Sequence, residues 1–232
     1  MSDLPGLADR LGELARAFQA ERSVADTLDA IVRAAVGTVP GADHAGVSQV
    51  ENRRTVRTTT GTDRLVYDVD QIQYDEHEGP CLDALFDHLT VLVADMAGEA
   101  RWPRFSARAL TLGVGSMLAF QLYVDSGSLG SLNLYSRRPG AFGDVSEQVG
   151  LLFAAHAGVA LAGAQQLSHL SRALDVRDLI GQAKGILMER HKLTGDQAFG
   201  LLVTVSQKTN TRLVEVARYL VDTGDLGARD RA

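Results

Sequence analysis

Residues 177–190 read RDLIGQAKGILMER, a stretch whose spacing predicts an amphipathic helix. Apolar residues recur along one face of that helix, at Val176, Ile180, Ala183 and Leu187. The neighbouring face carries a second set at the same spacing: Arg177, Gly181, Lys184 and Met188. We expect the apolar face to pack against other helices of the same domain, and the neighbouring face to meet a partner.

Two glycines interrupt this helix, and each costs about 1 kcal/mol relative to alanine. Close approach of another backbone or of a nucleotide to Gly181 and Gly185 would offset that cost, with Lys184 between them to meet a phosphate. The alternative is structural: tight helix–helix contact at both glycines, with Lys184 simply solvated.

Two further helices are expected downstream, one capped by Thr194 and running to about Thr209, the other capped by Thr211 and running to Gly224. Polar side chains gather at their junction: Ser206, Gln207, Lys208, Asn210 and Arg212. Such groups can bind base edges and phosphates. The alternative is local, with Ser206 on a carbonyl, Asn210 as a left-handed helix end and Arg212 in a surface ion pair. Phe199 is expected in the core.

The preceding chain alternates helical and strand patterns and predicts an α+β domain with a mostly antiparallel sheet. Expected helices cover 4–20, 23–39, 62–74, 80–88 and 102–112, and expected strands cover 44–51, 53–60, 90–94, 116–125 and 129–136. The expected domains are therefore 1–165 and an all-helical 166–226, followed by a frayed tail at 227–232. One long helix over residues 145–188, without proline, is expected to join them.

That long helix carries an apolar stripe beyond the sheet domain, formed by Leu167, Leu170 and Leu174. An exposed stripe of this kind is an aggregation liability, so we expect a parallel homodimer through these leucines.

Composition and charge limit the classes of function that this protein can have. Residues 1–171 carry 13 Arg and no Lys against 21 acidic residues, whereas residues 172–232 carry 7 Arg and 3 Lys against 8. An acidic body with a mildly basic end favours a polyanionic partner for that end. Because residues 1–171 hold no lysine, a phosphorelay receiver is disfavoured. One cysteine excludes an internal disulfide, and the apolar runs break within about ten residues, so we expect a cytoplasmic protein without a membrane span.

No enzyme signature is present: the sequence holds no GxSxG, HExxH or P-loop. Cys81 and His77 are too few to hold a metal, and a lone cysteine is more often a small buried hydrophobe. Asp75, Glu76 and Glu78 are expected to be solvated loop charges. We therefore expect neither catalysis nor a metal site.

The stretch at 177–190, continued by Ala198-Phe199, Ser206-Gln207, Asn210 and Val216-Ala217, resembles the ANTAR domain over about residues 168–226. ANTAR domains are three-helix RNA-binding modules of transcription antitermination. The resemblance implies that this part binds paired stem-loops in nascent leader RNA and prevents a terminator hairpin from forming. The expected RNA contacts are Arg177, Gly181, Lys184, Gly185, Met188, Ser206, Gln207, Lys208, Asn210 and Arg212.

Upstream, five segments resemble a GAF domain of the kind fused to ANTAR in actinobacteria, over about residues 20–165. They are EGPCLD at 78–83, RWPRF at 101–105, Gly113-Val114, LGSLNLY at 129–135 and FAAHA at 153–157. GAF domains bind small molecules in a cavity on one sheet face, which implies a sensor with an unidentified small-molecule ligand. Two other functions stay open: a DNA-binding helix-turn-helix regulator, and a dimeric interaction module without nucleic acid.

Overall fold

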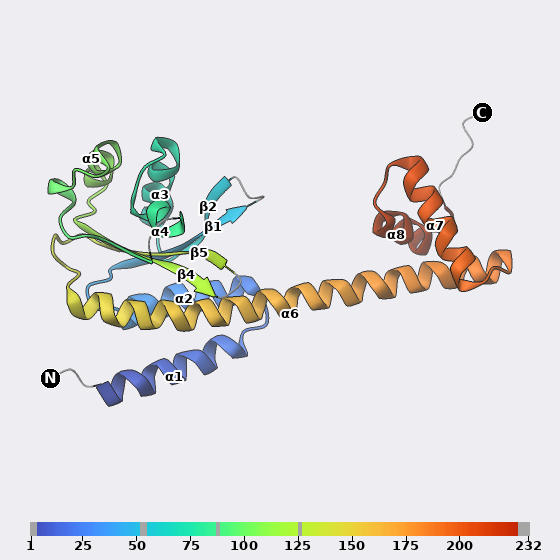
Figure 1. Cartoon of the computed structure of the whole chain (residues 1–232), viewed down its shortest axis with the longest axis horizontal. Helices are drawn as coiled ribbons and strands as arrows, with labels where there is room; N and C mark the ends of the chain where they lie inside the picture. Colours follow the sequence, from blue (N-terminus) through green and yellow to red (C-terminus); the bar gives the residue numbers. More distant parts are fainter. Residues whose placement is uncertain (1–3, 52–54, 87–88, 125–126, 227–232) are drawn as a thin grey trace. The chain divides into compact units, whose positions relative to one another are not determined.

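The structure, a computed structural model, describes residues 4–51, 55–86, 89–124 and 127–226 (Figure 1). The chain divides into two compact units, Met1–Gln166 and Leu167–Ala232. The predicted tail at 227–232 lies outside the described residues. Each unit is built around a hydrophobic core of its own.

The first unit alternates helices and strands as the sequence pattern predicts. Its elements are α1 (Leu4–Ala20), α2 (Val24–Thr38), β1 (His44–Glu51), β2 (Thr55–Gly61), α3 (Arg64–Glu76), α4 (Pro80–Phe86), β3 (Thr90–Val93), a 3₁₀ turn η1 (Met96–Gly98), α5 (Pro103–Thr111), β4 (Ser116–Val124) and β5 (Gly127–Ser136). Ser23 caps α2 by accepting the Asp26 N–H at 3.1 Å, and Asp63 caps α3 by accepting the Leu65 N–H at 2.8 Å.

The five strands form one antiparallel sheet in the order β2-β1-β5-β4-β3. Side chains alternate across it, so that on β5 Leu132 and Leu134 face one core while Asn133 and Tyr135 face the opposite side. The helix α2 and the start of α6 (Asp144–His191) cover the first face, and α3, α4 and α5 cover the second (Figure 1). The helix α1 packs on the outer side of α2 and α6, where Phe18 contacts Phe153. The predicted α+β architecture is confirmed.

The second unit holds the end of α6 together with α7 (Gly195–Thr209) and α8 (Leu213–Thr223). Its core is small and aliphatic: Ala183, Leu187, Ala198, Leu202, Val205, Val216, Ala217 and Leu220. A capping box begins α7, in which Thr194 accepts the Gln197 N–H and Gln197 accepts the Thr194 N–H. The predicted three-helix arrangement and the uninterrupted long helix are confirmed.

Two local features differ from what the sequence predicted. The N-cap of α8 is Arg212 rather than Thr211, and no side chain caps that helix. The turn η1 was not anticipated, because three residues capped by Asp95 leave no periodic signal. The first two residues of the strand expected over 53–60 and the last two of the helix expected over 80–88 lie outside the described residues.

The helix α6 also corrects the expectation about apolar runs. Residues 148–171 contain no Asp, Glu, Lys or Arg. Among the described helices α6 is the one long and apolar enough to cross a membrane, with a mean hydropathy of 1.3 over its best 18 residues, of which 44% are buried within the protein. Val149, Phe153, Ala157 and Leu161 of this region belong to the core against the sheet, so core packing accounts for much of its apolar character.

Candidate functional site

The glycines of the second unit stand in open space. A Cβ added at Gly181 or at Gly185 would meet no heavy atom within 4 Å among the described residues. The structural alternative, tight helix–helix contact within the chain, is therefore not observed at either position. The cost of two glycines inside a helix is therefore not offset by packing within the described part of this unit.

Lys184 lies between these glycines and is half-buried. Its Nζ lies 3.6 Å from where a Cβ on Gly195 would stand, so the ammonium group is beside the first turn of α7. Within the described residues Lys184 makes no ion pair or hydrogen bond. Lys208 stands near the other end of α7 and is likewise without such a partner. Lys208 follows Gly195 by thirteen residues, or about 20 Å of helix, so the two lysines mark opposite ends of α7.

The polar junction residues have local roles. Ser206 Oγ donates to the Thr211 carbonyl at 2.6 Å, Asn210 takes the left-handed conformation that ends α7, and Arg212 pairs with Glu215. These are the local alternatives that the sequence left open. Gln207 is exposed, and its side chain makes no hydrogen bond within the described residues. Gln207 and Lys208 therefore remain available to a ligand at this corner.

The exposure of aromatic side chains in the second unit differs from what the sequence predicted. Phe199 was expected in the core, but its side chain is 40% exposed on α7, and Tyr219 on α8 is 49% exposed. The small aliphatic core is complete without Phe199, because Ala198, Leu202 and Val205 already fill the inner face of α7. The unit thus offers two aromatic surfaces on which unpaired bases could stack.

A groove runs between the end of α6 and α8. It is lined by Gln182, Gly185, Ile186, Glu189, Arg190 and Val221. Arg190 donates from Nη1 to the Gly224 carbonyl and so joins the end of α8 to α6. Gly185 keeps this groove open, since any larger residue would place its Cβ in that free space.

The leucine stripe of α6 is not covered by other parts of the same chain. Leu167 is 69% exposed, Leu170 58% and Leu174 51%, and Met188 further along is 40% exposed. Single exposed leucines are ordinary on protein surfaces, but a row at helical spacing indicates a surface that packs against something.

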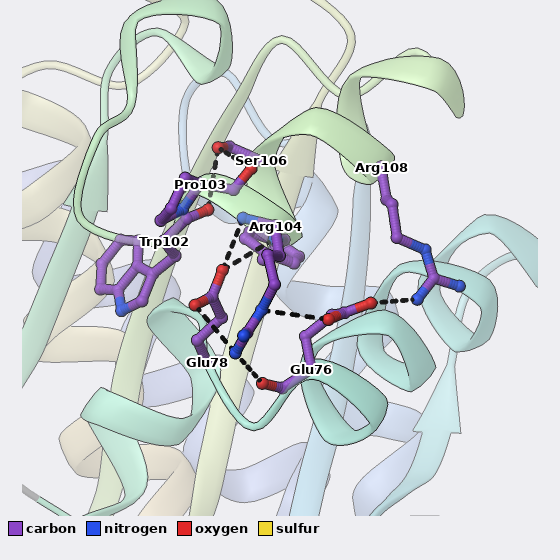
Figure 2. A network of polar contacts seen from close by, with 8 residues as sticks. Glu76, Glu78, Trp102, Pro103, Arg104, Ser106 and Arg108 are labelled. Carbon is purple, nitrogen blue, oxygen red and sulfur yellow. Dashed lines mark hydrogen bonds and ion pairs between the residues drawn. The ribbon is translucent and has the colours of Figure 1, made fainter.

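In the first unit, polar residues of the sequence motifs bond to other parts of the same unit. Figure 2 shows Glu78 reaching the start of α5, where its Oε1 accepts the backbone N–H groups of Arg104 at 2.7 Å and Phe105 at 3.0 Å. The N-cap residue Trp102 has no side-chain cap, so Glu78 supplies from α3–α4 what the local sequence lacks. This contact joins the EGPC and RWPRF segments, which are more than twenty residues apart.

Glu76 completes that network. It pairs with Arg104 at 3.2 Å and with Arg108 at 2.7 Å, while Arg104 also donates to the Glu76 carbonyl at 2.8 Å (Figure 2). The expectation of merely solvated charges is therefore wrong for Glu76 and Glu78, although Asp75 is exposed and bonded only to the exposed Gln71. Sequence spacing could not reveal this, because the arginines belong to a different helix.

A buried carboxylate that the sequence did not flag lies between α3 and the sheet. Asp70 is fully buried and accepts hydrogen bonds from Thr58 Oγ1 at 2.7 Å, Ser48 Oγ at 3.2 Å and Gln73 Nε2 at 2.9 Å, and from the Tyr135 hydroxyl. Burial raises the pKa of the Asp70 carboxyl, and its hydrogen bonds oppose that rise. The sequence held one indication that Asp70 is buried. Asp70 lies on the same helix face as Val66 and Gln73, which is the buried side of α3.

Cys81 belongs to the same buried region. Its backbone N–H donates to Gln73 Oε1 at 2.8 Å, and burial raises the pKa of its thiol to about 12. The thiol is therefore protonated at neutral pH and is not an activated nucleophile. Gly79 is needed nearby, since its φ is 142° and a Cβ there would lie 2.4 Å from Gln73 Oε1. His77 is an exposed left-handed helix end.

Within the described residues, no group of three or more His, Cys, Asp or Glu side chains is arranged to hold a metal ion. Every buried side-chain nitrogen or oxygen of the described part of the chain has a hydrogen-bond partner.

Comparison with protein families assigns both units. The GAF domain matches residues 21–162, and the ANTAR domain matches residues 168–221. A search of curated proteins finds no match.

Solved structures agree on the fold of the first unit. The GAF domain of a phosphoenolpyruvate-protein phosphotransferase from Coxiella burnetii is 14% identical with a TM-score of 0.56, over 72% of this chain and 99% of that one. A domain of a putative two-component sensor histidine kinase from Sinorhizobium meliloti is 15% identical with a TM-score of 0.52, over 62% and 94%. The chromophore-binding domain of a bacteriophytochrome from R. palustris is 10% identical with a TM-score of 0.55, over 72% and 64%.

At such identities these likenesses establish the fold alone. The family matches go further, because the GAF match covers more than half of the chain and the ANTAR match covers most of the second unit. The chain belongs to the GAF domain family and carries an ANTAR domain after its GAF domain.

Proposed function

We propose that this protein is a cytoplasmic, homodimeric regulator that binds RNA stem-loops through its ANTAR domain and stabilises antiterminator folds in nascent leader RNA. The observation that carries the proposal is the ANTAR match over residues 168–221, on a helical unit whose Lys184 and Lys208 have no partner among the described residues. Cations without an internal partner are available to neutralise phosphates and release counterions.

The geometry favours contact with more than one part of an RNA hairpin. Lys184, beside the start of α7, and Lys208, near its end, are about 20 Å apart, which is too far to share one phosphate, so each would contact a different, non-adjacent phosphate of a stem. Phe199 and Tyr219 add exposed aromatic faces that can stack on unpaired loop bases. Gln207 beside Lys208 supplies a side-chain amide that can read a base edge.

The GAF domain controls this output in the proposal. The helix α6 supplies the last helix of the GAF domain and the first helix of the ANTAR domain without a break. A change in the sensor core can therefore reach the output through one continuous element, which a flexible linker would not allow. The trigger is a small molecule or another event in the GAF domain, and the proposal assigns no catalysis to either domain.

The experiment is a binding competition. A fluorescent hairpin RNA is bound to the full-length protein and displaced by unlabelled hairpin RNA, by duplex DNA of the same sequence, or by single-stranded RNA. The proposal predicts displacement by hairpin RNA alone at equal concentrations. Effective displacement by duplex DNA would instead support a helix-turn-helix regulator, and absence of any binding at low salt would support an interaction module without nucleic acid.

A further inference from the structure

The face of the sheet beneath α3 carries polar side chains where a protein core is ordinarily apolar. Ser48 of β1 pairs with Thr58 of β2 on one side and with Ser131 of β5 on the other, so three hydroxyl groups form a row across three strands. Asn133 and Tyr135 follow Ser131 at every second residue of β5 and therefore share its face. Burying such groups costs free energy unless each finds a hydrogen-bond partner.

The hydrogen bonds of this region converge on one carboxylate. Five side chains donate to Asp70, and we call them the donor set: Thr58 at 2.7 Å and Ser48 at 3.2 Å to Oδ2, and Gln73 at 2.9 Å, Asn133 at 3.5 Å and the Tyr135 hydroxyl to Oδ1. Tyr74 stands behind this set and donates to Ser48 Oγ at 2.7 Å. An ionised carboxylate only accepts hydrogen bonds, so it is the group that these donors fit.

The arrangement resembles a ligand site more than a packed core. A core that only has to be stable can be built from apolar side chains of similar size. Small-molecule sites instead place a few polar groups so that they converge on the polar end of a ligand. Here hydroxyl and amide groups from three strands and one helix surround two oxygens, and the carboxylate that they hold is fully buried.

Close packing of α3 against the sheet delivers Asp70 to the donor set. A Cβ on Gly46 would clash with Val66 Cγ1, and a Cβ on Gly61 would lie 2.9 Å from the same atom. Val66 precedes Asp70 by about one helical turn, so the two glycines allow α3 to approach closely enough for the carboxylate to reach the strands. The carboxylate therefore belongs to a helix, while most of its donors belong to the sheet.

We infer that the donor set is a carboxylate-binding site of the GAF domain and that Asp70 is its resident ligand, supplied by the chain itself. The Asp70 side chain occupies the position that the acid group of a free ligand would take. A small molecule that acts at this face of the sheet must therefore displace Asp70 from the donor set, and small carboxylates are the chemical class that fits. This inference concerns the GAF domain and does not depend on RNA binding by the ANTAR domain.

Removing the tethered carboxylate and supplying a free one tests the site. Asp70→Gly is made in the full-length protein, and its unfolding in urea is followed by circular dichroism at neutral pH, with sodium formate or sodium chloride at equal ionic strength. Formate is the smallest carboxylate and replaces the group that the substitution removes. At about ten times its dissociation constant, formate should shift the folding equilibrium of Asp70→Gly toward the folded state by about tenfold, and chloride should not.

Matched variants separate binding at the site from other effects of formate. Asp75→Gly places a glycine on the exposed side of the same helix and leaves the donor set occupied, so formate should not stabilise it. Wild type and Asp70→Asn keep the space filled, so neither should respond. Thr58→Val, added to Asp70→Gly, removes one donor at nearly constant size and should weaken formate binding by about fivefold.

The experiment also decides the case in which Asp70→Gly does not fold in chloride. Formate should then restore its helical circular dichroism, and Asp70→Ala, with a better helix former, gives the same comparison in a more stable protein. Stabilisation of these variants by formate, without a response in the controls, supports the site. Failure of formate to stabilise either variant, or equal stabilisation of Asp75→Gly, overturns it. Neither result bears on the competition between RNA and DNA, which tests the proposed function separately.

Discussion

The two domains contrast at several of their polar groups. In the GAF domain, Glu76 and Glu78 are tied to Arg104 and Arg108, and Asp70 is enclosed by hydroxyl and amide donors. In the ANTAR domain, Lys184 and Lys208 have no partner among the described residues, and two helical glycines stand in open space. Internal pairing stabilises a fold, whereas a lysine without an internal partner contributes little to stability and a glycine inside a helix lowers it. Mutation should therefore affect stability in the first domain and binding in the second.

The largest effect is expected from removing the buried carboxylate. Asp70→Ala leaves the hydroxyls of Thr58 and Tyr135 buried without their acceptor, at a cost of about 3 kcal/mol in the free energy of unfolding. Urea denaturation measures the change. Asp75→Ala, on the exposed side of the same helix, is the matched control and should change stability by less than about 0.5 kcal/mol. Equal effects of the two substitutions would contradict the account of this core.

The same carboxyl sets a pH dependence. Burial raises the pKa of Asp70 above its ordinary value of 3.8, so between that value and the raised pKa the folded state holds a proton that the unfolded state has lost. The free energy of unfolding therefore falls as pH rises through this window. Asp70→Asn does not titrate, so its stability relative to wild type should improve as pH rises above about 4. Parallel stability profiles of the two proteins would show that the carboxyl does not carry the effect.

The next effect concerns binding. Lys184→Ala should weaken hairpin RNA binding by about 2 kcal/mol, or roughly thirtyfold, and reduce the salt dependence by about one phosphate contact. Its free energy of unfolding should hardly change, because the ammonium group has no internal partner. Lys192→Ala is the control, since that lysine is exposed and already paired with Glu189. Unchanged affinity in Lys184→Ala would remove this residue from the RNA site.

A smaller effect tests the contact between the two GAF segments. Glu78→Ala removes the acceptor for the first N–H groups of α5 and should cost about 1 kcal/mol of stability. Glu78→Gln retains an acceptor oxygen and should lose less. Neither substitution should alter the RNA affinity of the ANTAR domain, and a large loss of affinity in either would mean that this network does more than hold α5.

The sequence predicted most of this fold because its signals are local. The start of a helix can be predicted from its capping residue alone, as Ser23 shows for α2 and Thr194 for α7. The apolar spacing of α6 likewise predicts that helix without knowledge of distant residues. Contacts across elements were not predictable in that way: Glu78 caps a helix twenty-six residues away, and Asp70 meets hydroxyls from two strands. The exposure of Phe199 was missed because an aromatic in a small helical domain is ordinarily core, whereas here aliphatic residues fill the space.

The central claim is that the ANTAR domain binds structured RNA through cations that the fold leaves unpaired. Sequencing the RNA that co-purifies with the protein tests it most directly, with the double variant Lys184→Ala/Lys208→Ala for comparison and Lys192→Ala as the control. The account predicts that wild type and Lys192→Ala enrich leader transcripts containing stem-loops and that the double variant loses this enrichment. Recovery of the same transcripts with the double variant, or of no RNA above background with wild type, would contradict it.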